Sequence, residues 1–127
     1  MTPTTELARA KDLPVYLVLE GDLLVATDIS DALSARGPCR VVHVTTPEEV
    51  AAAIATEPVL AAAFVEMRLA ALREAGLAEA LAARGAQMIL TTGEADLEAV
   101  LALGWFMLLR PFSDEMIRAV LPAQPAL

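Results

Sequence analysis

The sequence predicts an α/β domain built on a parallel β-sheet. Five short apolar runs alternate along the chain with longer, alanine-rich segments that have helical periodicity. Hydrophobic residues make up 57% of the 127 residues and charged residues 20%, which is a composition suited to one folded core. Because no internal repeat or linker-like stretch divides the chain, we expect a single domain.

The apolar runs predict strands, and the first has the composition of a strand that is buried on both faces. The first, residues 15–20, reads VYLVLE and is apolar without interruption up to its final glutamate. The other four predicted strands are residues 40–44, 59–66, 86–91 and 105–109.

A helical segment follows each predicted strand. Residues 22–36 place their large apolar side chains on one helical face, and Gly37-Pro38 ends the pattern. Thr46 is suited to the N-cap of a second helix, over residues 46–55, with Pro47 at its first position. The remaining helices are predicted at residues 71–84, 94–103 and 114–121.

Five strands that alternate with five helices predict a flavodoxin-like, three-layer sandwich. The expected sheet is parallel, with strand order 2-1-3-4-5. We expect the domain to span residues 13–122, between an N-terminal arm at residues 1–12 and a C-terminal tail at residues 123–127. In such folds ligands bind at the carboxyl ends of the strands, so the residues that follow each strand are the candidates for function.

Charge and composition exclude several classes of function. The net charge of −8 argues against binding to nucleic acid or to anionic lipid, since both need a basic surface. No apolar run reaches the roughly 20 residues of a membrane span, and the N-terminus does not resemble a signal peptide, so we expect a cytoplasmic protein. Cys39 is the only cysteine, which excludes an intrachain disulfide.

The residues at the strand ends resemble those of the receiver domains of bacterial response regulators. The resemblance rests on VLEGD, FVEMRL, LTTG and LLRPF, in that order, and covers residues 14–121. It implies a first strand that ends in two acidic Mg²⁺ ligands and a third that ends in the aspartate that accepts a phosphoryl group. It also implies a hydroxyl residue after the fourth strand, and Lys-Pro-Phe with a cis peptide bond after the fifth.

The chain departs from this pattern at its acidic positions. Glu20 matches the first acidic residue, but Gly21 occupies the second, and Asp22 comes one residue late and is expected to start the helix. Glu66 occupies the position of the phosphoacceptor aspartate. We therefore expect no bound metal and no cofactor.

The hydroxyl and cation positions are kept in part. Thr92 and Gly93 match the hydroxyl residue and the small residue after it, although Thr92 could instead cap the next helix. Arg110 replaces the usual lysine, and Lys11, the only lysine of the chain, lies outside the predicted domain. We expect Arg110 to pair with Glu66.

The resemblance also implies a protein-binding surface at the fifth strand and the last helix. We place it around Trp105, Met107, Met116 and Arg118. Soft methionine side chains next to an aromatic ring are suited to such a contact.

The leading hypothesis is an atypical, stand-alone receiver that binds proteins in two-component signalling and is not an enzyme. Its partner would be a histidine kinase, another two-component protein or a second copy of the chain. Two alternatives remain: a working phosphoacceptor receiver in a histidine-kinase phosphorelay, and an unrelated flavodoxin-like domain that binds a small ligand.

Overall fold

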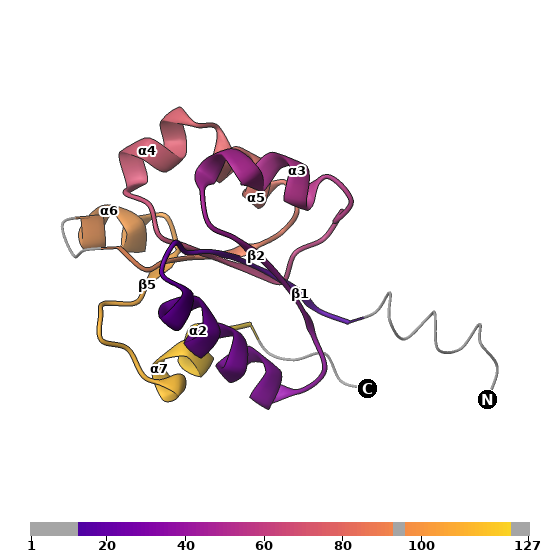
Figure 1. Cartoon of the computed structure of the whole chain (residues 1–127). Helices are drawn as coiled ribbons and strands as arrows, with labels where there is room; N and C mark the ends of the chain where they lie inside the picture. The colour runs from indigo at the N-terminus through magenta and orange to yellow at the C-terminus, as the bar shows by residue number, and fades with distance from the viewer. Residues whose placement is uncertain (1–12, 93–95, 123–127) are drawn as a thin grey trace.

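A five-stranded parallel sheet forms the centre of the protein, in the order β2-β1-β3-β4-β5 (Figure 1). The computed structural model describes residues 13–92 and 96–122. Helices α2 and α7 cover one face of the sheet, and α3, α4, α5 and α6 cover the other. The predicted three-layer architecture and strand order are confirmed.

The five predicted strands are all present, but four of them are shorter than predicted. They are β1 (Val15–Leu19), β2 (Arg40–Val44), β3 (Ala62–Val65), β4 (Gln87–Leu90) and β5 (Phe106–Met107). The predicted third strand began at Val59, whose side chain is exposed in the loop that precedes β3. Apolar character alone therefore placed the start of this strand too early.

Among the described residues the helices number six, with one short 3₁₀ turn, rather than five. They are α2 (Leu23–Arg36), α3 (Val50–Ile54) after the 3₁₀ turn η1 (Pro47–Glu49), α4 (Leu69–Glu74), α5 (Leu77–Ala82), α6 (Leu97–Ala102) and α7 (Asp114–Ala119). The extra helix arises because the predicted helix 71–84 is two helices, divided at Gly76. This residue has φ = 73°, a left-handed conformation that glycine adopts at low cost.

Two apolar clusters, one on each face of the sheet, form the core. Along β1, Leu17 and Leu19 belong to the cluster under α3, α4, α5 and α6, whereas Tyr16 and Val18 belong to the cluster under α2 and α7. This alternation is the period of a β-strand, and all five residues of β1 are buried. Strand β1 is therefore packed on both faces, which holds the residue that follows it in a defined place.

Three charged residues hold together the loops at the amino edge of the sheet. Arg40, the first residue of β2, forms two hydrogen bonds of 3.1 and 2.7 Å to the buried carboxylate of Glu57. The Arg84 guanidinium donates to the backbone carbonyl oxygens of Ile54, Glu57 and Ala80. The charged side chains at the amino edge of the sheet are therefore engaged in structural contacts. The candidate functional residues lie at the carboxyl edge.

No helix within residues 13–92 and 96–122 is long and apolar enough to cross a membrane.

The turn after β2 predicts a pH-dependent contribution to stability. One carboxylate oxygen of Glu49 accepts hydrogen bonds of 2.8–3.1 Å from the backbone N–H and the hydroxyl of both Thr45 and Thr46. These bonds favour the charged form and lower the pKa of Glu49 below its usual value. The hydrogen bonds therefore contribute fully to folding stability when the pH is above the pKa of glutamate in the unfolded chain. This contribution is lost as the pH falls through the lower pKa of Glu49 in the folded protein.

An NMR titration of the Glu49 side-chain carboxyl tests this expectation. In the variant Thr45→Val/Thr46→Val the two hydroxyl donors are missing, so the pKa of Glu49 should rise toward the ordinary value. An identical titration curve in the parent and the variant would contradict the contacts described for this turn.

Candidate functional site

Three polar residues lie level with one another at the carboxyl edge of the sheet. The parallel register pairs Leu19 with Val65, and Val65 with Leu90, so the next residues, Glu20, Glu66 and Thr91, form a row across β1, β3 and β4. The backbone ladder continues through this row, because the N–H of Glu66 donates to Leu19 and that of Thr91 donates to Val65.

The strand period places this row on the same face of the sheet as α2 and α7. Leu19, Val65 and Leu90 all belong to the core cluster of the opposite face, and side chains alternate along a strand. Leu108, which follows β5, also lies on the α2–α7 face, and Arg110 comes two residues later. The fold therefore gathers Glu20, Glu66, Thr91 and Arg110 from four different strands.

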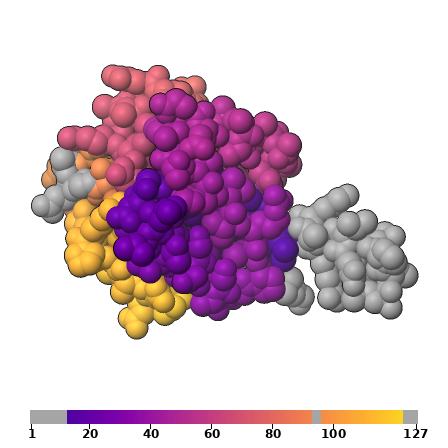
Figure 2. Space-filling model, viewed as in Figure 1, coloured from indigo at the N-terminus to yellow at the C-terminus, as the bar shows by residue number. Residues whose placement is uncertain are grey.

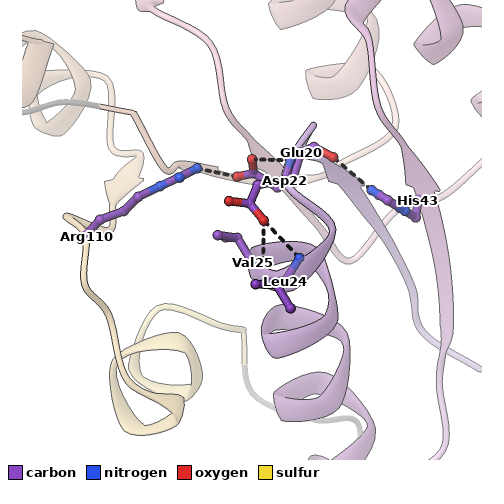
Figure 3. Close-up of polar contacts among 6 residues, drawn as sticks. All are labelled: Glu20, Asp22, Leu24, Val25, His43 and Arg110. Carbon is purple, nitrogen blue, oxygen red and sulfur yellow. Dashed lines mark hydrogen bonds and ion pairs between the residues drawn. The ribbon is translucent and has the colours of Figure 1, made fainter.

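Glu20 is the buried centre of the site, with only 3% of its surface exposed. One carboxylate oxygen accepts a hydrogen bond from Arg110 Nη2, and the other accepts a 3.0 Å bond from the backbone N–H of Asp22 (Figure 3). His43 Nε2 lies 2.9 Å from the backbone carbonyl oxygen of Glu20 and donates to it, because a carbonyl oxygen only accepts. Both carboxylate oxygens of Glu20 are thus already engaged within the protein.

The predicted ion pair between Glu66 and Arg110 is wrong, because the Arg110 guanidinium lies against Glu20 instead. The physical reason is burial. A buried carboxylate without a partner is costly, whereas the exposed Glu66 is hydrated and gains little from an ion pair. The Arg110–Pro111 peptide bond is cis, as the resemblance implies.

Asp22 is the N-cap of α2, as predicted. Its Oδ1 accepts hydrogen bonds from the backbone N–H groups of Leu24, at 2.9 Å, and Val25, at 3.5 Å (Figure 3). This carboxylate satisfies donors of the first helical turn, which is the usual role of an aspartate at this position. Asp22 therefore serves the helix and does not replace the acidic residue that is missing at position 21.

Gly21 has space for a side chain. A Cβ atom added there would lie 3.6 Å from the carbonyl oxygen of Thr45, which is an ordinary van der Waals contact. The glycine is therefore not required by crowding. Its consequence for the site is chemical, since no carboxylate is present where the resemblance implies one.

The hydroxyl that lies level with Glu66 belongs to Thr91 rather than to Thr92. Thr91 is 1% exposed, and its Oγ1 has no hydrogen-bond partner in the described structure. Thr92, the residue chosen from the sequence, is half-buried and one position further along, and Gly93 lies outside the described residues. Counting register from Leu90 would have identified Thr91, but the two consecutive threonines conceal that register in the sequence.

The four residues of the predicted protein-binding surface lie on two different sides of the sheet. Trp105 and Met107 are half-buried and pack against the core cluster on the α6 side of the sheet. Met116 and Arg118 are exposed on α7, which lies on the other face. The two pairs therefore do not form one continuous patch.

Other exposed apolar side chains lie along this edge of the sheet. Phe106 is exposed between Trp105 and Met107, because neighbouring residues of a strand face opposite sides. Leu101 on α6 and Leu103 directly after it are exposed as well. Sequence analysis placed the surface at Trp105 and Met107 and did not name these three residues.

Two solved structures resemble the chain over most of its length. One is a response regulator receiver protein from Burkholderia phymatum, with a TM-score of 0.66 and 22% sequence identity, covering 84% of this chain and 91% of the other. The second is a response regulator receiver protein from Sinorhizobium medicae, with a TM-score of 0.65 and 17% identity, covering 86% and 92%.

The chain has the fold of response regulator receiver proteins. No protein-family model matches the sequence, and the comparison with curated proteins gives no match. The similarity at these levels of identity concerns the fold. The chemistry of the site must therefore be argued from the residues themselves.

The residues present do not fit the divalent cation that the receiver fold implies. Mg²⁺ requires several oxygen ligands in near-octahedral geometry. Here both oxygens of Glu20 are engaged, Gly21 supplies none, and the Asp22 carboxylate caps α2. In the described ranges no three His, Cys, Asp or Glu side chains gather in a way that could hold a metal ion. The guanidinium of Arg110 supplies the positive charge at Glu20.

Proposed function

We propose that the chain is a receiver-like module of two-component signalling that binds a protein partner without being phosphorylated. A cytoplasmic location, a non-catalytic role and a protein partner are parts of this proposal. The partner would be a histidine kinase, another two-component protein or a second copy of the chain.

The observation that carries the proposal is the ion pair between Arg110 and Glu20. Acceptance of a phosphoryl group on a carboxylate requires a cation that is free to neutralise the charge of the transferred group. Among the ion pairs of the described structure, only that of Arg110 includes a residue of the strand-end row, and this guanidinium is engaged by a buried carboxylate. Glu66 is exposed, so it has no buried environment that would activate it.

The exposed apolar edge supports a role in protein binding. Leu101 on α6, Leu103 directly after it and Phe106 on β5 are each at least 39% exposed. Contiguous apolar patches on a soluble domain often mark contact sites. A partner that covers this edge would bury these side chains.

A phosphorylation assay tests the absence of phosphoryl acceptance. The chain is incubated with Mg²⁺ and acetyl phosphate, and its intact mass is measured by mass spectrometry. We expect no mass increase, because Gly21 supplies no ligand and Arg110 is held on Glu20.

A known phosphoacceptor receiver in the same reaction provides the positive control. The Glu66→Gln variant separates a specific adduct from modification elsewhere, since it removes the carboxylate at the acceptor position. A stoichiometric, base-labile adduct that is present in the parent and absent in Glu66→Gln would contradict the proposal and favour a working phosphoacceptor.

A further inference from the structure

Asp96 connects two helices that lie on the same side of the sheet, α4 and α6 (Figure 1). It directly precedes α6, but its Oδ2 accepts a 2.8 Å hydrogen bond from the backbone N–H of Leu69, the first residue of α4. Its Oδ1 lies 3.5 Å from Arg68 Nη2. The Asp96 side chain is only 18% exposed, so it is held against the start of α4.

The carboxylate of Asp96 caps α4 instead of its own helix. Arg68 occupies the N-cap position of α4, and its side chain makes no capping bond to the described residues of that helix, so Asp96 supplies an acceptor that α4 lacks locally. Asp96 is itself the N-cap of α6, where an aspartate normally accepts from the second or third helical N–H. Its side chain makes no such bond within α6. One carboxylate therefore stands at two helix termini, and in this structure it serves α4.

The backbone of Asp96 fits this arrangement. An aspartate that caps its own helix has an extended backbone, as Asp22 has at the start of α2, with φ = −88° and ψ = 113°. Asp96 has φ = −101° and ψ = 6° instead. Capping of α6 by Asp96 therefore requires a rotation about ψ together with release of Leu69. The two arrangements are separate conformations, which is what a two-state element requires.

We infer that Asp96 is a latch with two arrangements, one that ties α6 to α4 and one that caps α6 and releases α4. The segment around α4, rose in Figure 2, lies at the surface of the molecule, and the Arg68 side chain is 66% exposed, so its pair with Asp96 holds the latch only weakly. Because α6 carries the exposed Leu101, the latch sets the position of part of the apolar edge. This consequence for a partner rests on the proposed protein-binding role, whereas the latch itself is tested without a partner.

Hydrogen exchange of the backbone amides, measured by NMR on the full chain, tests the latch. Arg68→Asp places a second carboxylate beside Asp96, which is repelled, and the new aspartate gives α4 a local cap. Position 68 is exposed, so the substitution does not disturb the core. We expect the protection factor of the Leu69 amide to fall roughly fivefold, and those of Glu98 and Ala99 in the first turn of α6 to rise roughly fivefold.

Two matched variants isolate the role of the Asp96 carboxylate. Arg68→Ser also removes the arginine and gives α4 a local cap, but it adds no charge, so the protection of Glu98 and Ala99 should equal that of the parent. In Arg68→Asp/Asp96→Ala the carboxylate of the latch is absent. The first turn of α6 should then gain no protection, although position 68 carries the same aspartate as in the single variant.

The fluorescence of Trp105, the only tryptophan of the chain, reports on the other end of α6, because its backbone N–H donates to the carbonyl oxygen of Val100 at 3.3 Å. Its emission should shift in Arg68→Asp and not in Arg68→Ser.

The inference is overturned if Leu69 loses protection while α6 gains none, because Asp96 would then be only a cap of α4. It is also overturned if Arg68→Asp and Arg68→Ser give the same protection in α6 or the same emission of Trp105. These measurements use neither a partner nor a phosphoryl donor, so failure of the latch and failure of the proposed function are separate results.

Discussion

The variant Arg110→Ala should lower the free energy of unfolding by about 2 kcal/mol. Removing one partner of a fully buried pair costs roughly 3–5 kcal/mol, and an exposed pair contributes about 0–1 kcal/mol. The pair of Arg110 and Glu20 lies between these limits, since the Glu20 side chain is 3% exposed and the Arg110 side chain 40%. Urea denaturation followed by circular dichroism measures the change.

A second substitution separates loss of the ion pair from loss of packing. In the double variant Glu20→Gln/Arg110→Ala no charge is left buried, so part of the stability should return relative to Arg110→Ala alone. Arg118→Ala provides the matched control. Arg118 is an exposed arginine of α7 that forms no ion pair with the other described residues, and its removal should change stability by less than about 0.5 kcal/mol. A coupling energy near zero between positions 20 and 110 would mean that the pair does not form in solution.

The sheet could be predicted from the sequence because its signals are local. The run VYLVLE is apolar over a length typical of a buried strand, and β1 lies within one residue of that prediction. The order of the strands followed from the alternation of strands and helices, because parallel strands need crossover connections. The division of the predicted helix 71–84 was missed because an isolated glycine is tolerated inside a helical pattern, so Gly76 alone did not mark a boundary.

The partner of Arg110 could not be predicted, because burial decides it. Glu20 and Glu66 carry the same carboxylate, and in the sequence each directly follows a predicted strand. In the fold, Glu20 follows β1 and is covered, whereas Glu66 follows β3 and is exposed, although both strands lie inside the sheet. The two carboxylates differ only in how other elements of the fold pack around them. The residues next to each glutamate in the sequence do not predict that packing.

The sequence also could not predict which threonine lies level with Glu66 at the strand ends. Thr91 and Thr92 are chemically identical, and the match to a hydroxyl residue followed by a small one favoured Thr92. Pairing between β3 and β4 places Thr91 level with Glu66 instead. A shift of one residue moves a side chain to the other face of a sheet, so it changes which hydroxyl faces the site.

The variant Gly21→Asp/Glu66→Asp/Arg110→Lys should accept a phosphoryl group that the parent does not. Gly21→Asp adds a carboxylate where the structure leaves space for a Cβ atom. Arg110→Lys replaces the planar guanidinium, which has five N–H donors, by a compact ammonium group. This change weakens the ion pair with Glu20. Glu66→Asp shortens the acceptor side chain by one C–C bond, about 1.5 Å. The expected result is a Mg²⁺-dependent mass increase of one phosphoryl group after incubation with acetyl phosphate.

The thermal midpoint gives a second measurement that is independent of phosphoryl transfer. A cation that binds only the folded state raises the midpoint by mass action, so millimolar Mg²⁺ should stabilise the triple variant and leave the parent unchanged. The control carries Glu66→Asn in place of Glu66→Asp, together with the other two substitutions, and should not form the adduct. If the triple variant neither binds Mg²⁺ nor forms an adduct, the three altered positions are not what prevents phosphoryl acceptance. The cause would then lie elsewhere in the site, and the next position to vary is Thr91, whose buried hydroxyl has no partner among residues 13–92 and 96–122.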